Sequence, residues 1–78
     1  MKIKVELFTI LKKYDKGKIL ENHSVILDEG TNLLGLTRYL EIPDRVGIIF
    51  LVNQFPKDKE YVLKEGDEVK LYSLICGG

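Results

Sequence analysis

The chain has 78 residues, of which 45% are hydrophobic and 31% are charged, and its twelve basic residues are balanced by twelve acidic ones. This balance excludes the strong electric field that attracts nucleic acid or an anionic membrane. The length and composition are typical of a single globular domain, which we assign to residues 1–78.

The first predicted strand covers residues 2–9, KIKVELFT. Ile3, Val5 and Leu7 alternate with charged residues, which is the period of a half-buried strand. Phe8 interrupts the pattern, because it is apolar but lies on the charged side.

Residues 11–22 are polar and include four lysines, so they predict an extended loop with room for a helical turn. A solvated loop is the favoured interpretation, and contact between these lysines and acidic groups of a partner is the alternative. Residues 23–28, HSVILD, predict a second strand, and residues 28–30 predict the turn that closes it.

A helix is predicted after this turn, with Thr31 accepting hydrogen bonds from its first amides. Apolar side chains recur there at spacings of three and four and form one face: Leu33, Leu36 and Leu40, widened by Leu34 and Tyr39. Because Pro43 disfavours helical angles at the residue before it, the helix should end near Glu41.

Residues 46–53, VGIIFLVN, form a continuous apolar run. They predict a strand covered on much of both faces, which we place at the centre of the sheet. Asn53 and Gln54 give a weak hairpin signal, since glutamine tolerates a positive φ poorly. Pro56 then restricts any following strand to an edge of the sheet.

Val62 and Leu63 are the expected apolar anchors of the next segment, and Gly66 supplies a tight turn. The last strand covers residues 68–75, EVKLYSLI. Its side chains alternate, with Val69 and Leu71 on one side and Tyr72 and Leu74 on the other.

The predicted order is strand, strand, helix, strand, short edge strand, strand. A single helix covers one face of the sheet, and the first and last strands can pair in parallel at its centre. The sequence therefore predicts an α+β fold of the ubiquitin-like β-grasp type, with a mixed sheet of four to five strands.

A search for catalytic and metal-binding groups is negative. His23 is the single histidine, and the chain contains neither a glycine-rich phosphate loop nor a recognisable nucleophile setting. The acidic residues are dispersed among lysines, so no metal site is predicted. We expect His23 to have an ordinary surface role.

Phe8, Tyr72 and Leu74 form the candidate partner-binding patch. If the first and last strands are neighbours, these three side chains project from the sheet face opposite the helix. A contiguous apolar patch there indicates a partner. The alternative is scattered exposed apolar surface, which is common in proteins.

The sequence ends in Gly77 and Gly78, and we expect residues 75–78 to form a mobile tail. Glycine loses the most freedom on ordering, so this ending contributes little to a fold. Extended Gly-Gly can instead pass through a channel too narrow for side chains and bring the Gly78 carboxylate to a reactive phosphorus atom. The binding energy must then come from the folded body. A frayed chain end is the alternative.

Cys76 is the single cysteine, which excludes an internal disulfide and fits a reducing compartment. Residues 1–9 resemble neither a secretion signal nor a membrane anchor. We therefore expect a cytoplasmic protein.

Four segments occur in a characteristic order: residues 28–43 (DEGTNLLGLTRYLEIP), residues 50–54 (FLVNQ), Glu65–Val69 and the terminal Cys76–Gly78. Together they resemble the sulfur-carrier proteins of the ThiS and MoaD type. The resemblance covers nearly all of the chain from Asp28 onward.

This resemblance implies that an ATP-using enzyme related to ubiquitin activators adenylates the Gly78 carboxylate. The product is then converted to a thiocarboxylate that delivers sulfur to a cofactor precursor, while Gly77 and Cys76 thread the tail into the partner. ATP is used by the partner enzyme, and the chain itself is expected to bind no cofactor. It would be a carrier and a substrate, not an enzyme.

The long connection at residues 11–22 and the VNQ segment look more like the small subunit of molybdopterin synthase than like thiamin-type carriers. They imply delivery of sulfur to molybdopterin or a tungsten cofactor, with a synthase large subunit as a second partner. Cys76 is either a small hydrophobe or a thiol that reacts near the activated carboxylate.

Three other functions stay open. The chain could be a thiamin-type sulfur carrier, a ubiquitin-like modifier joined through Gly78 to lysines of other proteins, or a β-grasp adaptor that never uses its tail.

Overall fold

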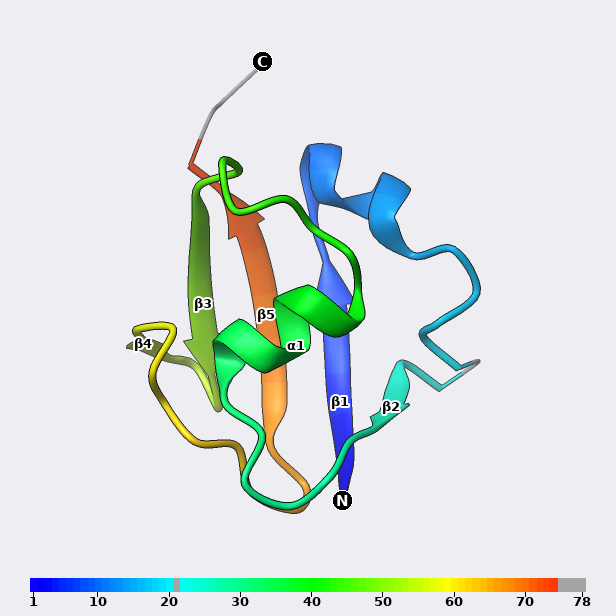
Figure 1. Ribbon diagram of the computed structural model, residues 1–78, viewed down its shortest axis with the longest axis vertical. Coiled ribbons are helices and arrows are strands. Elements are labelled where there is room, and N and C mark those ends of the chain that lie inside the picture. Colours follow the sequence, from blue (N-terminus) through cyan, green and yellow to red (C-terminus); the bar gives the residue numbers. More distant parts are fainter. Residues whose placement is uncertain (21, 75–78) are drawn as a thin grey trace.

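The computed structural model describes residues 1–20 and 22–74, which form a five-stranded mixed sheet with one α-helix packed on one face (Figure 1). In chain order the elements are β1 (Lys2–Leu7), the 3-10 helix η1 (Thr9–Tyr14), β2 (Ser24–Ile26), α1 (Leu33–Tyr39), β3 (Ile48–Val52), β4 (Phe55–Lys57) and β5 (Glu68–Ser73). This order confirms the predicted α+β fold. The predicted tail at residues 75–78, with Cys76, Gly77 and Gly78, lies outside the described residues.

The strands are ordered β2-β1-β5-β3-β4, with β1 parallel to β5 and the other neighbours antiparallel. The predicted parallel pairing of the first and last strands is therefore confirmed, and β5 is the central strand. The prediction that the apolar run at residues 46–53 forms the central, doubly covered strand is wrong. β3 lies second from an edge, and its outward-facing Ile49 is 42% exposed.

The core lies between α1 and the inward-facing sides of the strands. Leu33, Leu36 and Leu40 are fully buried there, as the helical spacing predicts. Tyr39 is exposed and does not belong to this face. Most of the core is contributed by the three long strands and by α1 with its C-cap residue: Ile3, Val5, Leu7, Phe50, Val52, Val69, Leu71, Leu33, Leu36 and Leu40.

The start of α1 differs from the prediction, whereas its end at Tyr39 agrees with the predicted end near Glu41. Asn32, not Thr31, is the N-cap, and its side-chain oxygen accepts a hydrogen bond from the Gly35 amide at 2.8 Å. The Thr31 hydroxyl donates instead to the carbonyl of Asp28, so it closes the preceding turn. The helix ends at Tyr39, and Glu41 then adopts a positive φ of 59°.

The hairpin between β3 and β4 forms even though its signal in the sequence is weak. Asn53 and Gln54 both adopt positive φ, of 51° and 74°. The side chain of Asn53 fixes the turn, because it donates to Asp67 at 3.0 Å and accepts from the Glu68 amide at 3.1 Å. As predicted, β4 is an edge strand containing Pro56, and Gly66 forms a turn with a φ of +83°.

In the segment before β5, only one of the two predicted apolar anchors is buried. Leu63 is 2% exposed, whereas Val62 is 51% exposed and does not anchor the segment. The Leu63 amide donates to the carbonyl of Thr31 at 2.9 Å, which places this residue beside the start of α1.

We expect Leu63→Ala to lower the free energy of unfolding by about 2 to 5 kcal/mol, because it removes buried methyl groups and leaves a cavity. Val62→Ala is the matched control, and it should change stability by less than about 0.5 kcal/mol because its side chain is mostly in water. Urea unfolding of both variants measures the difference. Equal losses would contradict the observed register of this segment.

Candidate functional site

The sheet face opposite α1 carries the residues that the sequence singles out. Phe8 follows β1, and its amide donates to the carbonyl of Leu71 at 3.1 Å. This bond continues the parallel register by one residue and sets the Phe8 ring against Tyr72. The two rings are stacked, with centroids 4.5 Å apart and planes inclined by 7°. Two of the three predicted patch residues are therefore in direct contact.

Leu74 lies on the same face, one position past the end of β5. Its amide donates to the carbonyl of Gly47 at 3.0 Å, so the antiparallel pairing with β3 continues beyond Ser73. The Leu74 side chain lies over Gly47, since a Cβ atom there would approach Leu74 Cδ1 to 2.8 Å. A side chain at residue 47 would displace Leu74, which remains 58% exposed.

Further apolar residues extend this patch across the sheet. Ile49 lies opposite Tyr72, and Leu51 lies opposite Lys70 on β5 and opposite Pro56 on β4. Directly opposed side chains on one face are close enough to touch. We call the resulting surface the outer apolar stripe: Phe8, Tyr72, Leu74, Ile49, Leu51 and Pro56.

The sequence contains a signal for this extension. The unbroken apolar run at residues 48–52 gives β3 apolar side chains on both faces, which the sequence alone does not distinguish from a strand covered on both faces. In the structure α1 covers only one face, and the other is exposed. The apolar residues are neighbours and not scattered, so the contiguous-patch interpretation is favoured over the alternative.

The other half of this face is polar. Lys4 lies beside Glu68, and Glu6 lies beside Lys70, across the parallel pairing of β1 with β5. These residues place charges of both signs where β1 pairs with the first half of β5. Phe8, Tyr72 and Leu74 lie towards the other end of β5, from which residues 75–78 continue, whereas Leu51 and Pro56 extend the outer apolar stripe over β3 and β4 to the level of Lys70. The outer face is therefore charged around the start of β5 and apolar around its end and over β3.

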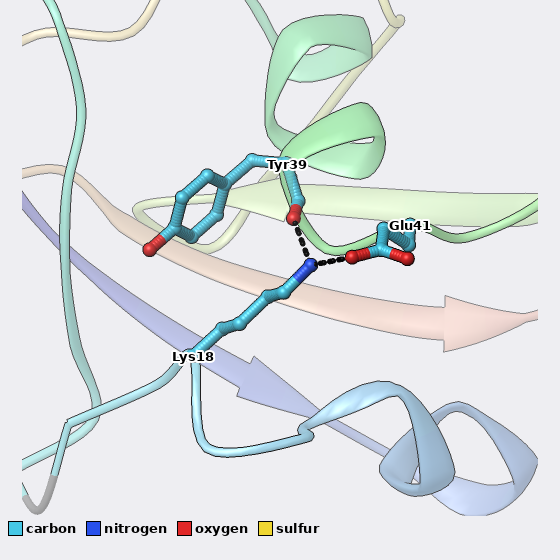
Figure 2. Close-up of polar contacts among 3 residues, drawn as sticks. All are labelled: Lys18, Tyr39 and Glu41. Carbon is cyan, nitrogen blue, oxygen red and sulfur yellow. Dashed lines mark hydrogen bonds and ion pairs between the residues drawn. The ribbon is translucent and has the colours of Figure 1, made fainter.

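Two of the four loop lysines make contacts within the molecule: the Lys13 ammonium group lies 5.4 Å from the centre of the Tyr14 ring, and Lys18 binds the end of α1. Figure 2 shows Lys18 reaching across to the end of α1, where its ammonium group donates to the Tyr39 carbonyl at 2.9 Å and forms a salt bridge with Glu41. The ammonium group also lies 5.7 Å from the centre of the Tyr39 ring. This contact fastens the loop after η1 to the helix, so Lys18 can bind a partner only by giving it up.

Among the described residues, the remaining candidates do not gather into a reaction site. His23 is exposed, and its amide donates to the carbonyl of Leu20 at 2.9 Å, as in a local turn. Within residues 1–20 and 22–74, no cluster of three or more histidine, cysteine or acidic side chains could hold a metal ion. In the same residues no helix has the length and hydrophobicity needed to cross a membrane.

The sheet order and the single helix on one face define a ubiquitin-like β-grasp fold. Among solved structures, the chain is similar to the crystal structure of SAMP1 from Haloferax volcanii, with a TM-score of 0.64 and 18% sequence identity over the whole of both chains. No protein-family model matches the chain, and no curated protein sequence matches it. The likeness at this identity establishes the shared fold.

We expect Lys18→Met to raise the pKa of Glu41 towards its ordinary value, because the hydrogen bond and the positive charge of Lys18 hold that pKa low in the folded protein. A lowered folded-state pKa stabilises the protein above the unfolded-state pKa, and this contribution is lost as the pH falls through the folded-state pKa. A carboxyl-carbon NMR titration measures the change. Lys12→Met is the control, and an unchanged Glu41 titration in Lys18→Met would show that the salt bridge does not form.

Proposed function

We propose that this chain is a sulfur carrier protein. In this proposal the Gly78 carboxylate is adenylated by a ubiquitin-activator-like enzyme and converted to a thiocarboxylate, which donates sulfur in molybdopterin or tungsten cofactor biosynthesis. The observation that carries the proposal is the outer apolar stripe, whose members Tyr72 and Leu74 lie at the end of β5 immediately before residues 75–78. The ubiquitin-like fold is consistent with a carrier of this kind.

The stripe supplies what the glycine ending lacks. Ordering two glycines costs free energy and creates few contacts, so a partner that takes up the tail must bind the folded body. Aromatic side chains in the centre of an interface commonly contribute most of the binding energy. The stacked rings of Phe8 and Tyr72, flanked by Ile49, provide such a centre close to the point where the tail begins.

The proposed chemistry needs a free carboxylate and a partner that holds ATP. A carboxylate oxygen of Gly78 attacks the α-phosphorus of ATP, and pyrophosphate leaves. A sulfur donor of the persulfide or sulfide class then attacks the acyl carbon, and AMP leaves with the bonding electron pair. In the persulfide case, a thiol must reduce the remaining sulfur–sulfur bond to release the thiocarboxylate. Gly77 and Cys76 pass through the partner's channel in this scheme.

Two features support the molybdopterin branch over the thiamin branch. The connection between β1 and β2 is long and contains η1, and β3 leads into the Asn53–Gln54 hairpin. Both resemble the small subunit of molybdopterin synthase more than a thiamin-type carrier. A synthase large subunit would then be the acceptor that binds the charged carrier.

The fold also supports a second candidate, a ubiquitin-like modifier joined through Gly78 to lysines of other proteins. Both candidates begin with the same adenylate, so they differ only in the group that attacks it. Affinity-tagged protein isolated from cells distinguishes them, because a modifier is recovered partly as covalent adducts and a dedicated carrier only as the free chain.

Incubation with the cognate activating enzyme, ATP and a sulfur donor should raise the intact mass of the chain by the difference between one sulfur and one oxygen atom, located at Gly78. The reason is that the thiocarboxylate replaces a single carboxylate oxygen. High-resolution mass spectrometry of the whole chain and of its C-terminal peptide measures this change.

The control is a chain with one residue added after Gly78, which should stay unmodified because its terminal carboxylate is displaced from the reacting phosphorus. Mass spectrometry of the natural protein also shows whether Gly78 is its last residue, as the proposal requires. An unchanged mass with an enzyme that modifies another carrier under the same conditions would contradict sulfur transfer.

Tyr72→Ala and Phe8→Ala should each weaken binding to the activating enzyme by about tenfold or more, because each removes one member of the stacked pair from the proposed interface. Phe55→Ala is the matched aromatic control. Phe55 is 66% exposed but lies opposite inward-facing Val52, so it is not part of the outer apolar stripe. Isothermal calorimetry measures all three affinities. Equal affinities for all variants would exclude the stripe from the interface.

A further inference from the structure

A second apolar surface borders β3 and adjoins the outer apolar stripe, with which it shares Ile49 and Pro56. It is a groove of about 550 Å³ between α1, the loop that follows it and the edge formed by β3 and β4. Its apolar lining comes from Leu34, Ile42, Val46, Ile48, Ile49 and Pro56. In Figure 1 this edge is the side of the sheet that carries β4.

In the described part of the chain, one residue of β3, Ile48, has unpaired backbone groups along this groove. Along β3 and its flanking residues, the odd-numbered residues direct their backbone amide and carbonyl groups towards β5. The carbonyl of Gly47 accepts a hydrogen bond from the Leu74 amide, and the amide of Asn53 donates one to the Glu68 carbonyl. Even-numbered residues therefore point towards β4. Phe50 pairs with Lys57 in this way.

Ile48 points its backbone amide and carbonyl to the same side, but β4 does not reach it. Pairing would require Lys59 opposite Ile48, and Lys59 instead accepts a hydrogen bond from the Leu34 amide at 3.0 Å. The chain thus leaves the sheet edge after Lys57 and crosses to α1. Among the described residues, none forms a hydrogen bond with Ile48 on this side. An unpaired edge of this kind is a template for another strand.

The rim of the groove is weakly cationic. Arg38, Lys57 and Lys59 border it, together with Asp44 and Asp58. Within the described part of the chain, neither Arg38 nor Lys59 has a salt-bridge partner. The Asp58 carboxylate is engaged locally, because it accepts a hydrogen bond from the amide two residues further on.

We propose that this groove binds an extended, apolar peptide segment of a partner protein, which adds to the sheet as a sixth strand beside Ile48. The unpaired backbone groups require an occupant with its own backbone donors and acceptors, and the lining requires apolar side chains. The three cations of the rim, against two carboxylates, favour acidic residues flanking the apolar part of the segment. This site goes beyond the proposed function, because it uses neither Gly78 nor the stacked aromatic pair.

The test is an NMR titration of the full chain with the capped peptide acetyl-Glu-Glu-Val-Phe-Val-Ile-Thr-amide. The peptide should slow hydrogen exchange of the Ile48 amide about tenfold or more and shift the signals of Leu34 and Val46. A second peptide of the same sequence carries N-methyl groups on alternate backbone amides. This peptide keeps all its side chains, but its methylated amides cannot donate hydrogen bonds to the backbone of β3. It should therefore bind at least about tenfold more weakly than the unmodified peptide.

Arg38→Glu should weaken binding of the unmodified peptide, because it reverses a charge at the rim. Lys12→Glu makes the same change of charge on η1, away from the groove, and should leave the affinity as it is. A chain extended beyond Gly78 should still bind the peptide, so failure of sulfur transfer and failure of this site are separate results.

Several outcomes would overturn the proposal. These are equal binding of the N-methylated peptide, signal changes confined to Phe8, Tyr72 and Leu74, and no saturation at millimolar peptide. Protection of Ile48 that rises with protein concentration in the absence of peptide would also overturn it, because a second copy of the chain would then occupy the edge.

Discussion

The structure depends on one constraint: a single helix of seven residues covers one face of a five-stranded sheet. β1 and β5 are parallel neighbours in the sheet, and their buried side chains, such as Val5 and Leu71, fill the space between these two strands and α1. Nothing in the described part of the chain packs as a second layer on the opposite face, so apolar residues there remain in contact with water. Such residues contribute little to folding, and their grouping needs an explanation in terms of binding.

Much of the fold follows from periodicity, and the deviations have physical causes. The spacing of leucines predicts the buried face of α1, because a helix repeats every 3.6 residues whatever packs on it. The choice between Thr31 and Asn32 as N-cap could not be made from sequence, since both residue types cap helices and only the local backbone decides. Whether Ile49 and Leu51 are covered could not be predicted either, because an apolar run does not reveal how many layers surround it.

The candidate site was predicted in part. Alternation in β5 placed Tyr72 on the outer face, and the break in pattern at Phe8 placed it on the same side, so their contact follows from parallel pairing. The contribution of β3 to the site could not be predicted without the antiparallel register between β3 and β5. The close approach of Leu74 to Gly47 could not be predicted without atomic positions. The free edge at Ile48 was also beyond prediction, because it results from the point at which the chain leaves β4.

These features together describe a sheet whose outer face is charged where β1 pairs with the start of β5 and apolar around the end of β5, from which the predicted Gly-Gly tail continues. The most direct test of this account is a cross-saturation NMR experiment on the chain bound to the activating enzyme that the proposed function requires. The account predicts the strongest saturation at Phe8, Ile49, Tyr72 and Leu74. Strong saturation over α1, with these four residues unaffected, would contradict it.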